Sequence, residues 1–144
     1  MKTTIGILAA LWMFAATAFA QESFAQEWTL VGQDGNELVF VDRTSILEAG
    51  QFKKARMLRS FSTVQTIGDQ AFPHKSEILL YAVRCEDRSL GFEQWTLTAG
   101  EIGTGATVWT GQTEQPSLYK DPTDPLFASM IASVCSAVNS PNPS

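Results

Sequence analysis

The chain has 144 residues, of which 44% are hydrophobic and 17% are charged, and its formal net charge is −5. This length fits one domain, and this hydrophobic content excludes wholesale disorder. The acidic balance argues against a nucleic-acid binder, which needs a basic surface. Two cysteines are too few for a disulfide-dense scaffold or a four-thiolate zinc site, and the single histidine, His74, excludes any site that needs two imidazoles.

Residues 1–20 have the pattern of an export signal. Lys2 precedes an uncharged apolar run, and the small residues at positions 18 and 20 are typical of a signal-peptidase site. The run is shorter than the roughly 20 residues of a membrane-spanning helix. We expect cleavage after Ala20, with Ala25 as the second choice. The first choice leaves 124 residues with a net charge of −6, because the removed segment carries one lysine and no acid.

Export places the mature protein in the periplasm, at the cell surface or in the medium. Neither cleavage site has a nearby cysteine, so we expect no lipid anchor. The mature chain contains no second apolar stretch of membrane length, so we also expect no transmembrane segment.

The mature chain begins with a predicted hairpin. Apolar and β-branched residues at 28–31 and 38–41 flank the turn signal Asp34-Gly35-Asn36, a pattern typical of two antiparallel strands. Residues 42–50 are expected to form a short connection, in which Gly50 supplies a positive φ.

Residues 52–62 predict a third strand that carries an unusual concentration of positive charge. Alternation places Lys54 and Arg56 on one face, and Lys53 and Arg59 on the other. We favour the interpretation of an edge or partly exposed strand, which the charges protect from pairing with other chains. The alternative is a basic strip that binds an acidic partner.

Residues 63–75 predict a mobile loop that leaves His74 exposed. Residues 76–85, 90–98 and 106–110 predict three further strands, and apolar residues on both faces of the first indicate a central strand. Trp95 and Trp109 lie in the last two strands. We interpret them as core residues under a covering element, or alternatively as partly exposed aromatics that contact a ligand.

The last element is an amphipathic helix that starts at Asp124 and Pro125 and ends near Cys135. The sequence therefore predicts an α+β fold: one antiparallel β-sheet of about six strands with a single C-terminal helix packed on it. The domain would span 21–138, followed by a flexible tail at 139–144. In an exported protein, a disulfide between Cys85 on the sheet and Cys135 on the helix would tether the two layers, with two buried free thiols as the alternative.

No catalytic or metal-binding set is apparent in the sequence. Catalysis commonly requires a nucleophile, a base and an orienting group within hydrogen-bond reach, and one histidine in a predicted loop supports no such triad. If the two cysteines are bridged, neither is a nucleophile or a metal ligand. We therefore expect a protein that is not an enzyme.

Several parts of the chain share their order and spacing with a known family. They are Trp28-x-Leu30-Val31, the turn at Asp34-Gly35, Val39-Phe40-Val41-Asp42-Arg43-x-Ser45-Ile46, Gly50, the strand that ends in Cys85 and the helix that ends in Val134-Cys135. Together they resemble the surface-adhesin E domain of Gram-negative bacteria, over about residues 28–135. The resemblance implies a curved antiparallel sheet with a disulfide-tethered helix, and non-enzymatic binding.

The best-known member of this family binds host vitronectin, laminin and plasminogen, and also haem. The resemblance thus implies a protein partner, such as a host matrix protein or an envelope protein. We expect no cofactor, and haem held by His74 is a minor alternative. The alternatives to an adhesin are a periplasmic structural or accessory protein and a small-ligand carrier that uses the cleft between helix and sheet. A homodimer could form through a free strand edge.

Overall fold

The computed structural model describes residues 26–69, 71–120 and 122–137. The predicted signal segment, both candidate cleavage sites and the predicted tail lie outside these residues. The elements in chain order are β1 (Trp28–Asp34), β2 (Glu37–Ala49), β3 (Phe52–Gln65), β4 (His74–Arg84), β5 (Ser89–Thr98), the 3-10 turn η1 (Glu101–Gly103), β6 (Thr107–Gln112), β7 (Tyr119–Lys120) and α1 (Pro125–Ser136).

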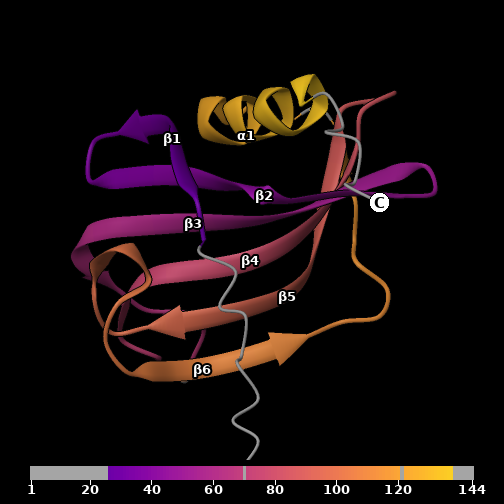
Figure 1. Ribbon diagram of the computed structural model, residues 1–144. Coiled ribbons are helices and arrows are strands. Elements are labelled where there is room, and N and C mark those ends of the chain that lie inside the picture. The colour runs from indigo at the N-terminus through magenta and orange to yellow at the C-terminus, as the bar shows by residue number, and fades with distance from the viewer. Residues whose placement is uncertain (1–25, 70, 121, 138–144) are drawn as a thin grey trace, which may run out of the picture.

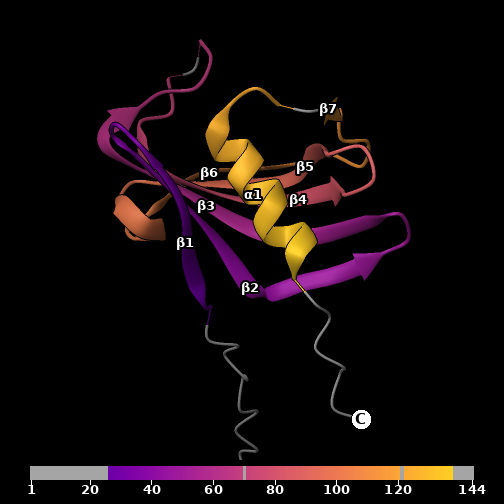
Figure 2. The same ribbon diagram turned by 90° about the horizontal axis from the view of Figure 1, so that it is seen from above.

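The strands form one antiparallel sheet in which β1 to β6 follow each other in chain order. The two-residue strand β7 pairs with the first two residues of β5, Ser89 and Leu90. Helix α1 lies on one face of the sheet, over β1–β4, and β6 forms the edge farthest from it (Figures 1 and 2). This arrangement confirms the predicted α+β fold of a six-strand sheet with a C-terminal helix.

Helix α1 is fixed at both ends. The carboxylate of Asp124 accepts a hydrogen bond from the Leu126 backbone N–H at 2.8 Å, and Pro125 occupies the first helical position, where no N–H donor is needed. At the other end, Cys135 forms a disulfide with Cys85, with 5.7 Å between the two Cα atoms. The predicted bridge between sheet and helix is therefore present.

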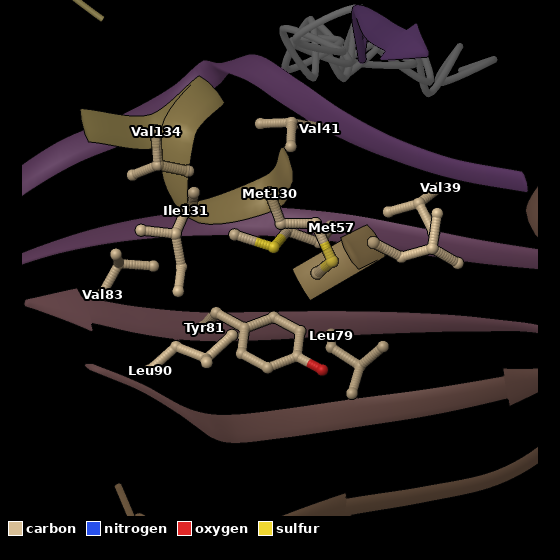
Figure 3. Close-up of a cluster of buried hydrophobic side chains, with 12 residues drawn as sticks. Val39, Val41, Met57, Leu79, Tyr81, Val83, Leu90, Met130, Ile131 and Val134 are labelled. Atoms are coloured by element: carbon tan, nitrogen blue, oxygen red, sulfur yellow. The ribbon is translucent and has the colours of Figure 1, made fainter. Parts of the chain in front are cut away.

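The core lies between the helix and the face of the sheet that it covers. Figure 3 shows side chains of β2 to β5 meeting three residues of the helix stripe. All of them are more than nine-tenths buried, which places the main apolar contribution to stability here. The labelled residues are Val39, Val41, Met57, Leu79, Tyr81, Val83, Leu90, Met130, Ile131 and Val134.

The opposite face of the sheet is covered in part by η1. The backbone N–H of Ile102 donates to the Ser60 hydroxyl, and that of Gly103 donates to the Ser76 hydroxyl, each at 2.9 Å. A β-carbon on Gly103 would lie 3.2 Å from the Ile78 side chain, so this turn packs directly on the strands. Strand β4 is thus central and covered on both faces, as its apolar pattern predicts.

The predicted edge position of β3 is wrong. This strand pairs with β2 on one side and with β4 on the other. Its charges are compatible with a central position because three of them have carboxylate partners on the neighbouring strands or on β5, and the fourth, Arg56, lies over the Trp28 ring. For example, Arg59 lies directly opposite Glu77 of β4.

Residues 42–49 of the predicted connection instead continue β2, whereas Gly50 lies in the turn that follows and has the predicted positive φ, 66°. The register shifts between Asp42 and Leu47, and within this bulge the Ser45 hydroxyl accepts the Arg56 backbone N–H at 2.8 Å. Buried Asp42 accepts hydrogen bonds from the backbone and the hydroxyl of Thr44. These side chains supply hydrogen bonds in place of the backbone bonds between strands that the bulge interrupts. The strand therefore continues through residues whose local sequence is typical of a turn.

Candidate functional site

A pocket of about 770 Å³ lies on the helix-covered face of the sheet. Helix α1 packs mainly against β1–β4, so the helix-facing side chains of β5 are left beside an open space. Strand β7 and the residues just before the helix close its far side. Its apolar walls come from Ile67, Leu79, Tyr81, Leu90, Phe92, Trp95, Tyr119, Pro122 and Phe127. This volume and lining are typical of small-molecule sites.

Aromatic rings form a continuous series along the pocket. The Tyr81 ring lies 6.3 Å from both the Phe92 ring and the Phe127 ring, in each case edge to face. Phe92 in turn lies 4.8 Å from Trp95. Edge-to-face pairs of this kind hold each ring in one orientation. The wall is therefore a preformed aromatic surface that joins β4, β5 and the first turn of the helix.

A charged cluster borders this wall. The Arg59 guanidinium donates to Glu37 at 2.6 Å and to Glu77 at 3.1 Å, and it lies 5.6 Å from the centre of the Phe127 ring. Burial by itself would lower the pKa of Arg59, but the hydrogen bond to Glu37 and the charges of Glu77 and Glu37 raise it above its ordinary value. Arg59 is therefore a permanently charged group whose charge is already compensated.

Tyr81 lies between this cluster and the apolar wall. Its side chain is 4% exposed. Burial raises the pKa of the Tyr81 phenol well above its ordinary range, because a phenolate would be poorly solvated there. The hydroxyl thus stays protonated and able to donate a hydrogen bond at physiological pH.

His74 is buried, so its predicted exposure in a mobile loop is wrong. It is the first residue of β4 and pairs with Gln65 of β3, which shortens the loop to 66–73. Its Nδ1 lies 2.7 Å from the Phe72 carbonyl oxygen, and its Nε2 lies 3.2 Å from a Glu77 carboxylate oxygen. Because both ring nitrogens have partners, the ring is buried at low cost and offers neither nitrogen to a haem iron.

The four residues of the predicted basic strip do not form one surface. Lys53 donates to the Ala137 carbonyl at 2.9 Å, near the end of the helix, and Arg59 belongs to the cluster beside the pocket. On the other face of the sheet, Lys54 pairs with Glu93 at 2.8 Å, and Arg56 lies over the Trp28 ring at 5.9 Å. Each of the four is therefore engaged within the chain.

The structure brings the two predicted tryptophans together. Trp95 and Trp109 are half-buried, and their ring centres lie 4.8 Å apart. Trp95 lines the pocket, whereas Trp109 lies outside its lining and contacts Phe72. The Trp109 ring lies over Gly111. Only glycine allows this position, because a β-carbon at residue 111 would collide with the ring.

The part of the chain that the structure describes contains no group of three or more histidine, cysteine or acidic residues placed to hold a metal ion. Over the same residues, no helix is long and apolar enough to cross a bilayer. Both cysteines are in the disulfide.

Sequence reasoning offered a cleft between helix and sheet as one alternative, but it did not identify the residues of the pocket. Alternation along 76–85 does place Leu79 and Tyr81 on one face, but it does not reveal that this face is left partly uncovered. Tyr119 and Phe127 come from separate segments, and no local signal links them to β4. A search for aromatic residues shared between the predicted sheet face and the helix stripe could have found Tyr81 and Phe127.

Comparison with known proteins agrees with this architecture. No curated protein matches the chain significantly in sequence. Among solved structures, the fold is similar to crystal form II of Haemophilus influenzae protein E, with a TM-score of 0.56 and 10% identity over 76% of this chain and 87% of that chain. A second structure of Haemophilus influenzae protein E gives a TM-score of 0.53 and 10% identity over 76% and 83% of the two chains. At this identity the likeness concerns the fold alone.

The sequence carries the family assignment. The sequence model of surface-adhesin protein E matches residues 28–136, from the first residue of β1 to the last residue of α1. This match confirms the resemblance found in the sequence, and the chain belongs to the surface-adhesin protein E family.

Proposed function

We propose that this protein is an exported, non-enzymatic binding protein whose partner is another protein. The observation that carries the proposal is the family match over residues 28–136, because the family is one of surface adhesins. The site agrees with binding: its described residues form a preformed aromatic pocket with compensated charges and no metal cluster. A host extracellular-matrix protein or plasminogen is the partner class that we propose.

The rim of the pocket is the surface best suited to such a partner. Tyr119 is 60% exposed and Ile67 is 41% exposed, and both line the pocket. Tyr119 lies on β7 next to Lys120, at the start of β5, whereas Ile67 follows the end of β3. Tyrosine is enriched among the residues that carry most of the binding energy in protein interfaces. We propose that Tyr119 contributes to partner binding.

Part of the basic strip also fits this role. Lys54 and Arg56 lie on the face of the sheet that the helix leaves free, whereas Lys53 and Arg59 stabilise the helix side. We therefore restrict the proposed strip to Lys54 and Arg56. Charges of this kind affect the rate and the salt dependence of association more than the final affinity.

The test is a binding panel with the mature protein. Vitronectin, laminin and plasminogen are immobilised, with serum albumin as the control surface, and binding is measured by interferometry at moderate salt. We expect saturable binding to at least one of the three and none to albumin. Failure to bind any of them would overturn the proposed partner class.

Variants then locate the surface. Tyr119→Ala should weaken the observed binding, and Leu47→Ala is the matched control because Leu47, which is 52% exposed, is a similarly exposed apolar side chain on β2 that lies outside the pocket lining. The pair Lys54→Gln and Arg56→Gln should slow association at low salt, with Lys75→Gln as the control. Equal rates for all of these variants would exclude both surfaces.

Location is tested on intact cells. A surface protein should be digested by externally added protease, whereas a periplasmic protein should resist until the outer membrane is opened. Resistance would favour the alternative role, a periplasmic accessory protein that binds an envelope protein.

A further inference from the structure

We propose that the pocket beneath the helix binds a neutral, ring-bearing small molecule that carries a hydrogen-bond acceptor, and that the Tyr81 hydroxyl donates to this acceptor. This site goes beyond the proposed protein partner and does not depend on it. The ligand class follows from three features of the pocket: a donor hydroxyl that opens to the pocket without a partner among the described residues, an aromatic wall and a balance of charges.

The unpaired donor is the Tyr81 hydroxyl. The side chain is more than nine-tenths buried, and the residue lines the pocket. Among the described residues, none forms a hydrogen bond with this hydroxyl. The hydroxyl oxygen itself is not enclosed, because the Ser133 hydroxyl is the one fully buried, unpaired side-chain polar atom of the described residues; the Tyr81 oxygen therefore opens to the pocket. In Figure 3 the ring lies between Leu79 and Leu90, with the oxygen on the side of Leu79. The hydroxyl of a largely buried tyrosine usually has a partner, so an acceptor on a ligand that enters the pocket would supply one here.

The wall favours a ring. Phe92, Trp95 and Phe127 present faces and edges around Tyr81, and their mutual contacts fix them before any ligand arrives. A flat apolar ring can meet such a wall edge to face or offset-stacked, at little cost in protein order. The volume of about 770 Å³ lies within the range of pockets that hold drug-sized ligands, so a ligand with several rings would fit.

The charges favour a neutral molecule. Arg59, which lines the pocket with Tyr81, already donates to Glu37 and Glu77. Asp124 also lines the pocket, and its negatively charged carboxylate is held in place by its hydrogen bond with the helix N-terminus. Lys120 at the mouth lies 3.6 Å from Asp87 and is largely exposed. An anion placed beside Tyr81 would thus face carboxylates without gaining an unpaired cation, and its desolvation would remain uncompensated.

Three naphthalene probes separate these features. Prodan is neutral and has a carbonyl acceptor, N-phenylnaphthylamine is neutral and lacks one, and anilinonaphthalene sulfonate adds a negative charge to the phenylnaphthylamine skeleton. Each is titrated into the full mature protein, and its fluorescence increase gives a dissociation constant. We expect saturable binding of one Prodan per chain, and at least about fivefold weaker binding of the sulfonate than of N-phenylnaphthylamine.

The variant Tyr81→Phe tests the donor. It removes the hydroxyl and keeps the ring, so Prodan binding should weaken about fivefold, whereas binding of N-phenylnaphthylamine should change less than twofold. Circular dichroism checks that the variant folds. Independently of Tyr81, Tyr119→Ala at the mouth should weaken both neutral probes, while Leu47→Ala should leave them unchanged.

Each outcome decides part of the proposal. Absence of saturable binding by both neutral probes would overturn the site. Equal loss of both in Tyr81→Phe would overturn the role of the hydroxyl, and equal affinity of the sulfonate and its neutral counterpart would overturn the ligand class. If the protein binds Prodan but none of the host proteins, the small-molecule site stands and the proposed function is overturned. If it binds a host protein but not Prodan, the proposed function stands and the small-molecule site is overturned.

Discussion

Removing the disulfide should cost much of the stability of this fold. The double variant Cys85→Ser, Cys135→Ser opens a covalent loop whose ends are separated by 50 residues. In the chain-entropy description, closing a loop of this length destabilises the unfolded chain by about 4 kcal/mol. Native domains commonly have a free energy of unfolding of about 5–15 kcal/mol. The variant should therefore still fold, but with a small remaining free energy of unfolding.

The structure indicates what would remain in that variant. Met130, Ile131 and Val134 still pack on the sheet, and the Lys53 ammonium still donates to the Ala137 carbonyl at the end of the helix. The helix should therefore stay docked, and the far-ultraviolet circular dichroism should be nearly unchanged. The loss should appear in the free energy of unfolding and not in the native spectrum.

Urea unfolding, followed by tryptophan fluorescence, measures the effect. With a slope of about 2 kcal/mol per molar urea, the midpoint should fall by about 2 M. Reduced wild-type protein is the control, because it lacks the bridge without any substitution, and it should agree with the double variant. A loss below about 1 kcal/mol in both proteins would refute the reasoning that the bridge acts by restricting the unfolded chain.

Three further predictions concern single residues. Asp124→Ala removes the helix cap and should lower the free energy of unfolding by about 1 kcal/mol, whereas an unchanged urea midpoint would contradict the capping role. Gly111→Ala should displace the Trp109 ring, reduce the near-ultraviolet circular dichroism and cost about 1–3 kcal/mol; an unaltered aromatic spectrum would count against the contact. The hydrogen bond from Arg84 holds the pKa of Asp87 well below its usual range. Because the folded pKa is the lower one, this stabilisation is present above the ordinary carboxyl pKa of about 4 and is lost as the pH falls further. Asp87→Asn should thus be less stable than wild type at neutral pH, with a gap that narrows in acid; a gap independent of pH would exclude this linkage.

Local patterns in the sequence predicted the elements that depend on near neighbours. The Asp34-Gly35 turn forms the β1–β2 hairpin, with Gly35 at a φ of 51°. Asp124 and Pro125 start the helix because a cap needs only residues within one turn of each other. The pairing of Cys85 with Cys135 could be predicted because export allows a bridge and the chain has only these two cysteines.

Features that depend on distant partners were harder to predict. The charges of β3 favour an edge when the strand is considered alone, but Glu37 and Glu93 on other strands supply the counter-charges that allow a central position. His74 reads as a loop residue until Glu77 and the Phe72 carbonyl satisfy its ring in the fold. In each case the free energy of burial depends on a partner whose position is set by strand register.

The sequence by itself determined the class of fold, the helix stripe, the disulfide and the family of this protein, because each rests on spacing along the chain. Only the tertiary structure decided which charged side chains pair with each other, the burial of His74 and the residues that line the pocket. That pocket joins Arg59, Tyr81, Tyr119 and Phe127 from four separate elements. It exists because the helix covers one part of a sheet face and leaves the rest open, and the packing of whole layers sets that boundary.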